Sequence, residues 1–306
     1  MSRTVAAIDC GTNSIRLLVL REEDDATLTE VTRQTRLARL GQGVDATGEF
    51  HPDALQRTFA IVDEYADLVA AEGVDEVRFV ATSAARDVSN RDVLDDGVRS
   101  RLGVGVDVIS GDEEARLSSA GVLSGVTSPR PTLIFDIGGG STELVVVGAD
   151  GDIASAVSLD IGAVRIKERF LHSEPPTPEE RDAARSFVAA QLDGSGADFG
   201  SVASAIGVAG TVTSVAAEVL GLTQYSREAV HRFVLSLDDV ERASGRWLEL
   251  TTDEIVSPIL PPLRAAVIGA GSMILLEIVR RVPGGSVIVS ETDILDGIAM
   301  ELLAKA

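Results

Sequence analysis

The sequence contains one cysteine, two lysines and three histidines among its 306 residues. A single cysteine excludes an internal disulfide. We interpret Cys10 as a small buried side chain rather than as a nucleophile. His51, His172 and His231 do not stand at the spacings typical of metal ligands, so we interpret all three as structural or solvated.

Long apolar runs are also missing. No stretch of eighteen apolar residues is present, and the first residues enter a strand pattern without the basic start and apolar stretch of a signal peptide. We therefore expect a cytoplasmic protein with no membrane partner. The length of 306 residues and the hydrophobic fraction of 45% are sufficient for two domains, each with its own core.

Positive charge is scarce. The chain has 48 acidic residues against 27 lysines and arginines, a net charge of −21, and its only lysines are Lys167 and Lys305. This balance argues against a general nucleic-acid binder. An acidic surface with arginine in place of lysine is typical of halophilic proteins, so we hypothesise a cytoplasm of high salt concentration.

Stability is then expected to depend on salt. Added KCl should raise the unfolding midpoint, because it screens the repulsion between the excess carboxylates. Unfolding curves from low to molar KCl measure this, and a midpoint that does not rise would count against the hypothesis.

Residues 132–147 carry the most informative pattern. An apolar run ends at Asp136, three glycines follow, and a second apolar strand begins, which predicts a hairpin. Glycines allow positive φ angles and let a ligand approach the backbone N–H groups, which together form an anion cradle. A carboxylate beside such a cradle would repel phosphate unless a divalent cation lay between them, so the pattern suggests a metal-phosphate site.

The same pattern occurs in residues 8–19, which indicates an internal duplication. The two copies align without a gap, pairing Asp9 with Asp136, Gly11 with Gly138, Ser14 with Ser141 and Leu17 with Leu144. One such match is weak support for a site. Two copies are much stronger, because facing hairpins could hold a polyphosphate from both sides.

Periodicity predicts the same order of elements in each half. Residues 5–33 read as three strands, and a helix with one apolar face covers 52–72. Strand, helix, helix and strand patterns follow up to residue 109, and residues 110–116 open a helix that runs through residue 122. The second half repeats this order from residue 132, with a late strand at 286–289 and a final helix from 293.

These patterns resemble the superfold of actin, sugar kinases and heat-shock ATPases. Within it, the chain is similar to the family of exopolyphosphatases and guanosine pentaphosphate phosphohydrolases, Ppx/GppA, in its short two-domain form. The stretches that carry the resemblance are 9–17, 82–90, 109–122, 135–145, 158–165 and 205–213.

The resemblance implies an α/β fold with two duplicated actin-like, ribonuclease H-like domains. Each would contain a mixed five-stranded sheet, and an interdomain cleft would hold the substrate. The expected domains are 1–124 and 125–292, with the final helix, about 293–306, packing back on the first.

The family mechanism assigns roles to particular residues. The stretch 110–116 matches the family motif whose second glutamate is the catalytic base, which makes Glu114 the candidate base that activates a water. Arg86 matches the arginine that clamps phosphate. Asp136 and Glu143 match the acids associated with the metal, expected to be Mg²⁺, and Asp9 is their counterpart in the first hairpin.

Phosphate is expected to bind the two hairpin loops and one arginine. The candidates are Thr12, Asn13, Ser14, Gly138, Gly139, Gly140, Ser141 and Arg264. Arg165 is a further possible contact along a chain-like substrate. Thr12 replaces the more usual serine but keeps the hydroxyl, and residues 293–297 lack an arginine present in many members, so no role is transferred to them.

Structural interpretations compete with several of these roles. Glu113 fits the acidic first turn of a helix, where carboxylates favour the positive end of the dipole. Arg86 could be a surface arginine paired with Asp87 or Asp92. Gly207 and Gly210 could serve only tight packing of a strand against a helix.

The sequence therefore predicts a Mg²⁺-dependent phosphohydrolase that releases terminal orthophosphate from polyphosphate, from guanosine pentaphosphate, or from both, as a homodimer. Two alternatives remain open. One is a sugar or acetate kinase of the same superfold, which would require an acceptor or ADP. The other is an actin-like or alarmone-sensing protein without turnover.

Overall fold

The computed structural model describes residues 2–86 and 88–305, and Met1, Asp87 and Ala306 lie outside the described residues. The chain divides into two compact units. The first comprises Met1–Gly121 and Ile294–Ala306, and the second comprises Val122–Asp293. The expected domain boundaries at 124 and 292 stay a prediction.

The first unit contains a mixed five-stranded sheet in the order β3-β2-β1-β4-β5. Strand β1 pairs antiparallel with β2 and parallel with β4. The carboxyl ends of β1 and β4 therefore lie at the same edge of the sheet. The strands are β1 (Arg3–Cys10), β2 (Ser14–Glu22), β3 (Leu28–Leu37), β4 (Glu76–Ala81) and β5 (Val106–Val108).

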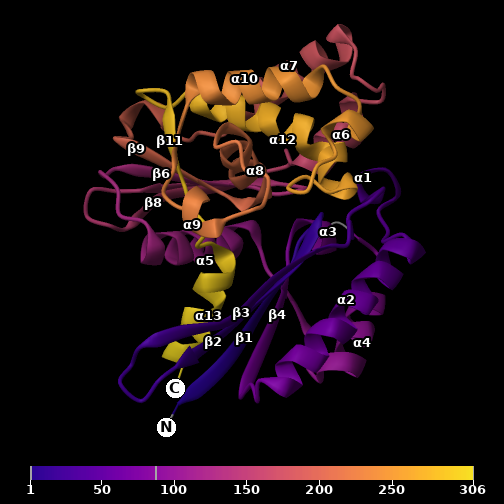
Figure 1. The fold of residues 1–306 in the computed structure, drawn as a ribbon, viewed down its shortest axis with the longest axis vertical. Helices are drawn as coiled ribbons and strands as arrows, with labels where there is room; N and C mark the ends of the chain where they lie inside the picture. The colour runs from indigo at the N-terminus through magenta and orange to yellow at the C-terminus, as the bar shows by residue number, and fades with distance from the viewer. Residues whose placement is uncertain (1, 87, 306) are drawn as a thin grey trace. The chain divides into compact units, whose positions relative to one another are not determined.

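Alternation along β1 covers both faces of this sheet. Ala6 and Ile8 belong to a core cluster with residues of α2 and α4, whereas Val5 and Ala7 pack with residues of α13. Figure 1 shows α2 and α4 side by side, and α13 against β1 and β2. The helices are α1 (Val44–Thr47), α2 (Pro52–Ala71), α3 (Ser83–Arg86), α4 (Arg91–Leu102), α5 (Gly111–Gly125), within which the division between the units falls, and α13 (Ile294–Ala304).

The second unit contains a mixed six-stranded sheet in the order β10-β11-β9-β6-β7-β8. Strand β6 pairs antiparallel with β7 and parallel with β9, as β1 does with β2 and β4. The strands are β6 (Thr132–Ile137), β7 (Thr142–Val147), β8 (Ile153–Leu159), β9 (Ser204–Val208), β10 (Val234–Ser236) and β11 (Ser286–Val289).

Helices of the second unit form a large core with this sheet. Figure 1 shows the arrangement of these helices. They are α6 (Ala163–Phe170), α7 (Pro178–Asp193), the 3₁₀ helix η1 (Phe199–Ser201), α8 (Ala209–Val219), α9 (Arg227–Val230), α10 (Leu237–Leu248), α11 (Thr252–Ile255) and α12 (Pro262–Val279). By length and composition α12 could cross a membrane, but 72% of it is buried inside the protein. A core helix passes the same test.

The predicted mixed α/β fold with a duplicated strand order is confirmed, with one difference. The second sheet has six strands rather than five, because Val234–Ser236 pairs antiparallel with β11. This strand is only three residues long and passes directly into α10, so its local pattern is too short to indicate a strand.

Candidate active site

The two predicted glycine hairpins have the same geometry. In the first, the Gly11 N–H donates to the Ser14 carbonyl over 2.9 Å, and in the second the Gly138 N–H donates to the Ser141 carbonyl over 3.0 Å. Each loop joins the first two antiparallel strands of its sheet. The gapless alignment of the two sequences is therefore also an equivalence of backbone structure.

The carbonyl groups of the second loop are held by the start of α6. Backbone N–H groups of Ala163 and Val164 donate to the carbonyls of Gly138 and Gly139 over 3.0 and 2.8 Å. Arg165 donates from Nε to the Gly140 carbonyl over 2.8 Å. A trans peptide directs its N–H opposite to its C=O, so the N–H groups of residues 139–141 point away from α6. This orientation suits the predicted anion cradle.

The first loop is held in a comparable way by the segment that follows β3. The N–H groups of Ala38 and Arg39 donate to the Asn13 carbonyl over 3.1 and 2.9 Å, and that of Gly41 donates to the Thr12 carbonyl over 2.9 Å. The N–H groups of Asn13 and Ser14 consequently point to the opposite side. Both loops thus direct consecutive amide groups away from the segment that holds them.

One glycine after the third strand makes each arrangement possible. A Cβ on Gly162 would lie 2.4 Å from the backbone of Gly139, and a Cβ on Gly41 would lie 2.2 Å from Cγ2 of Thr12. The sequence analysis missed both residues. Each follows a buried aliphatic residue just beyond the third strand, as Leu40-Gly41 and Ile161-Gly162, and Gly162 also lies in the stretch 158–165 that carries the family resemblance.

The aspartates of the two hairpins have different cross-strand partners. Asp9 lies opposite Arg16, whose Nε and Nη2 donate to Oδ2 of Asp9 over 3.0 and 2.6 Å. Asp136 instead lies opposite Glu143, and both carboxylates are buried. The duplicated positions have therefore diverged in charge. Arg16 neutralises the first aspartate across the strands, whereas the residue opposite the second aspartate carries a like charge.

The second hairpin fits a Mg²⁺ site better than the first. Magnesium is usually held by one or two carboxylates together with substrate phosphates and water. The 2–86 and 88–305 ranges contain no group of three or more acidic, histidine or cysteine residues placed to hold a metal, so a cage made of protein ligands alone is not present there. Asp136 and Glu143 supply the two carboxylates, and Ser158 Oγ orients Glu143 through a 2.7 Å hydrogen bond.

Asn13 adds an acceptor to the first loop. Its Oδ1 atom is buried and, within the part of the chain that the structure describes, has no hydrogen-bond partner. Such an atom in a native protein usually contacts a water or an ion. This observation supports a hydrated ligand at the first loop, although the Arg16 pair makes Asp9 itself a less suitable metal ligand.

The candidate base and the candidate arginine lie together in the first unit. Arg86, at the end of α3, donates from Nη1 to Oε2 of Glu114 over 2.8 Å and to the Ile109 carbonyl over 3.2 Å. Glu114 is in the first turn of α5 and is 9% exposed. Arg86 is thus not merely a solvent-exposed surface arginine. Of its two alternative partners, Asp87 lies outside the described residues.

A family model confirms the assignment suggested by these motifs, because the model of the Ppx/GppA phosphatase family matches residues 18–306. The chain belongs to this family. It is 40% identical to "Exopolyphosphatase 2" of Mycobacterium tuberculosis over 319 residues, which covers 97% of this chain and 98% of the relative. The predicted enzyme class, a hydrolase that acts on phosphoric anhydrides, is confirmed by these relatives.

Two further Ppx/GppA relatives extend the comparison. The crystal structure of the Aquifex aeolicus family member has a TM-score of 0.83 at 28% identity and covers 100% of this chain and 99% of that one. The "Guanosine-5'-triphosphate,3'-diphosphate pyrophosphatase" of Photobacterium profundum is 35% identical over 186 residues, 60% of this chain but 37% of the relative. The predicted fold class is therefore confirmed by a solved family member.

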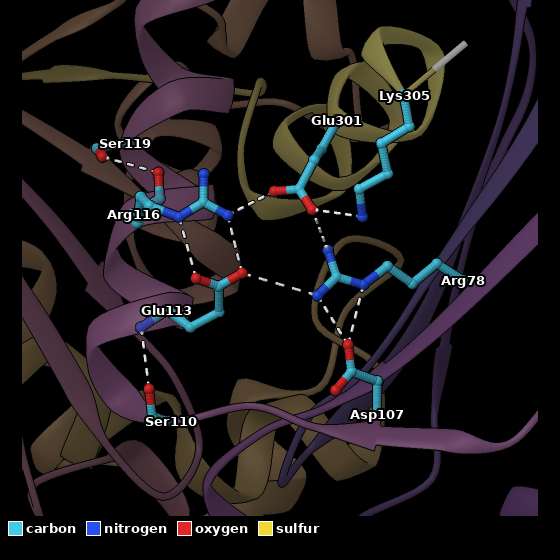
Figure 2. A network of polar contacts seen from close by, with 8 residues as sticks. All are labelled: Arg78, Asp107, Ser110, Glu113, Arg116, Ser119, Glu301 and Lys305. Atoms are coloured by element: carbon cyan, nitrogen blue, oxygen red, sulfur yellow. Dashed lines mark hydrogen bonds and ion pairs between the residues drawn. The ribbon is translucent and has the colours of Figure 1, made fainter.

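The two adjacent glutamates of the Ppx/GppA motif point to different partners. Glu114 is paired with Arg86, whereas Glu113 is paired with Arg116, whose Nε and Nη2 donate over 3.0 and 2.8 Å. The hydrogen bonds from Arg116 hold the pKa of Glu113 below its ordinary value. Successive helical residues differ by about 100° in direction, which separates the two roles. Figure 2 shows Glu113 within a network that includes Arg78 and Glu301.

The remaining candidates of this Ppx/GppA chain lie farther along the second unit. Arg264 lies in the first turn of α12, and a Cβ on Gly210 would be 3.1 Å from its guanidinium carbon. The phosphate-binding role of Arg264 stays a prediction. A Cβ on Gly207 would lie 2.7 Å from the Phe135 ring, which favours the packing interpretation of that glycine. Arg165 donates a hydrogen bond to the Gly140 carbonyl of the glycine loop.

Histidine and cysteine have the structural environments that the sequence indicated. His51 Nδ1 accepts a hydrogen bond from the Asp53 N–H at the start of α2, and His231 Nδ1 accepts from the Glu291 N–H. Cys10 is buried, and burial raises the pKa of its thiol far above the ordinary value. A thiol in that environment stays protonated and is a poor nucleophile.

Proposed function

We propose that this Ppx/GppA phosphatase is a Mg²⁺-dependent exopolyphosphatase that releases terminal orthophosphate from inorganic polyphosphate. The observation that carries the proposal is the 2.8 Å pair between Arg86 and the buried Glu114. It places a candidate base beside a candidate phosphate ligand, an arrangement suited to water attack on a phosphoryl group.

Each proposed residue has a defined task. Glu114 orients the attacking water and accepts its proton. Arg86 neutralises charge that develops on the phosphoryl oxygens. The amide groups of residues 13–14 and 139–141 bind phosphate oxygens, and Asp136 and Glu143 would hold Mg²⁺. When bound, this ion would neutralise negative charge on the phosphate.

Arg86 can bind Glu114 and a phosphoryl oxygen at the same time. Arg86 donates from one nitrogen to Glu114, and a guanidinium offers five N–H donors in a planar fork. It can therefore retain the carboxylate while it binds a phosphoryl oxygen. The carboxylate is held beside the arginine, so the water that it orients would lie next to the clamped phosphate.

Polyphosphate is the leading substrate because the relative named for it is matched over 98% of its own length. Guanosine pentaphosphate is the second candidate, since the relative named for a guanosine substrate is matched over only 37% of its length. The net charge of −21 repels a long anionic chain, and only 27 lysines and arginines are available to bind it. A high salt concentration would reduce this repulsion.

A side-by-side assay tests the substrate. Purified protein should release orthophosphate from long-chain polyphosphate in high KCl with Mg²⁺, faster than from guanosine pentaphosphate, and chelation with EDTA should abolish release until Mg²⁺ is returned. No acceptor or ADP should be needed, which separates hydrolysis from a kinase reaction. Faster turnover of guanosine pentaphosphate would reverse the substrate order, and no release from either would contradict the proposed function.

A further inference from the structure

We propose that the C-terminal helix α13 positions Glu114 for catalysis, with Glu301 as the positioning residue. The inference rests on the proposed function, because it takes Glu114 as the base. Three observations support it: an ion network, a backbone contact between α13 and α5, and the place of Glu114 between the anchored residues.

The network joins four elements of the first unit (Figure 2). Glu301 on α13 accepts hydrogen bonds from Arg116 on α5 and, over 3.1 Å, from Nη1 of Arg78 on β4. Arg78 also donates to Asp107 on β5 over 2.7 Å, and its Nη2 lies 3.7 Å from Glu113. Glu301 therefore connects the first turns of α5 to the sheet through two arginines.

The charges in this network balance. Arg78, Arg116 and Lys305 stand against Asp107, Glu113 and Glu301, in a chain that carries a net charge of −21. Hydrogen bonds from Arg116 and Lys305 hold the pKa of Glu301 at about 2, so it is ionised at neutral pH. Networks of several charges stabilise a structure more reliably than isolated surface pairs do.

Helices α13 and α5 also touch through their backbones. A Cβ on Gly297 would lie 2.0 Å from the carbonyl oxygen of Leu117, so only glycine permits this approach. Leu117 and Ile298 belong to the same buried cluster. Gly297 thus has a packing role in a segment to which the sequence assigned none.

The anchored residues flank the candidate base. Glu113 and Arg116 are held by the network and Leu117 by Gly297. Glu114 lies between them, and its N–H donates to the Ser110 carbonyl over 2.9 Å. The first turn of a helix lacks internal acceptors for its N–H groups and frays easily. Contacts from α13 would restrict its rotation, and a shift of about 1 Å at a catalytic group can cost about 10²-fold in rate.

Glu301→Gln tests the inference. Glutamine keeps the size of the side chain but removes the charge that holds both arginines. We expect kcat for phosphate release to fall about tenfold through partial loss of orientation, with KM changed less than about twofold, because the variant leaves the phosphate ligands in place. Urea unfolding at the assay temperature verifies that the variant is folded.

Asp296→Asn is the matched control. Asp296 also lies on α13, but its 2.6 Å ion pair joins Arg33 on β3. This variant removes a charge from α13 outside the network and should keep the wild-type kcat. An equal fall of kcat in both variants would show that α13 acts only through general stability, which would overturn the inference.

The same substitution in a Glu114→Gln background separates this inference from the proposed function. If Glu301 acts through Glu114, adding Glu301→Gln to Glu114→Gln should not lower the residual activity further. An inactive Glu114→Gln with an unchanged kcat in the single Glu301→Gln variant overturns the positioning role alone. Full activity of Glu114→Gln overturns both.

Discussion

Glu114→Gln is expected to lower kcat for phosphate release from polyphosphate by about 10²–10⁴-fold, the usual contribution of a general base. Glutamine preserves the shape of the side chain and can still accept a hydrogen bond from Arg86, but it cannot take a proton from water. Steady-state kinetics with Mg²⁺ measure the loss. KM should change little, because the amide cradles that bind phosphate are unaltered.

Glu179→Gln provides the control for this substitution. Glu179 is also an acidic residue in the first turn of a helix, α7, and is exposed. Both substitutions remove a favourable interaction with a helix dipole, and Glu114→Gln also removes the charge from the acceptor of Arg86, so Glu179→Gln measures the dipole effect alone and should keep the wild-type kcat. A wild-type kcat in Glu114→Gln would exclude Glu114 as the base, whatever the control shows.

Gly162→Ala is expected to reduce kcat/KM by about 10²-fold through displacement of the second phosphate loop. The added Cβ would lie 2.4 Å from the Gly139 carbonyl and 2.5 Å from the Gly140 nitrogen, and backbone atoms cannot rotate aside. Gly162 has φ −144° and ψ 161°, a conformation open to alanine. The effect is therefore steric. KM should rise, because the amide groups that bind phosphate move.

Gly245→Ala controls for the chemical change itself. Gly245 lies in α10, and a Cβ there would meet no atom within 4 Å. Alanine should stabilise that helix by up to about 1 kcal/mol and leave kinetics unchanged. Circular dichroism and unfolding curves distinguish a local shift of the loop in Gly162→Ala from global unfolding. Wild-type kinetics in a folded Gly162→Ala would contradict the role of Gly162 in positioning the loop.

Local patterns predicted much of the fold because the hairpins are local structures. An apolar run, a carboxylate and a glycine turn specify a hairpin within fifteen residues, and the pairing of Asp136 opposite Glu143 follows from its register. Strand β10 escaped detection because three residues are too few to establish a period of two. Its pairing depends on β11, some fifty residues later in the chain.

Long-range contacts account for what the sequence could not indicate at the site. The family motif identified Glu114 and Arg86 separately, but their direct hydrogen bond depends on how α3 and α5 pack. Glu301 meets Arg116 across 185 positions of sequence, and nothing near residue 301 marks it. Gly162 lies in the stretch 158–165 that carries the family resemblance, but its positioning role depends on its contact with Gly139, which the sequence does not indicate.

The divergence between the two hairpins is visible in their gapless alignment. Arg16 aligns with Glu143, so the two copies differ in charge at the residue opposite each aspartate. Arg16 lies opposite Asp9 and Glu143 lies opposite Asp136 because the two hairpins have the same strand register. This difference favours Asp136 and Glu143 over Asp9 as the ligands of the expected Mg²⁺.

Hydrolysis of polyphosphate in water enriched in ¹⁸O tests the central claim most directly. If Glu114 activates water for attack on the terminal phosphoryl group, each orthophosphate released by the wild-type protein should carry one ¹⁸O atom, and Glu114→Gln should form almost none of this product. Orthophosphate without the label, or labelled product formed by Glu114→Gln at the wild-type rate, would contradict the account.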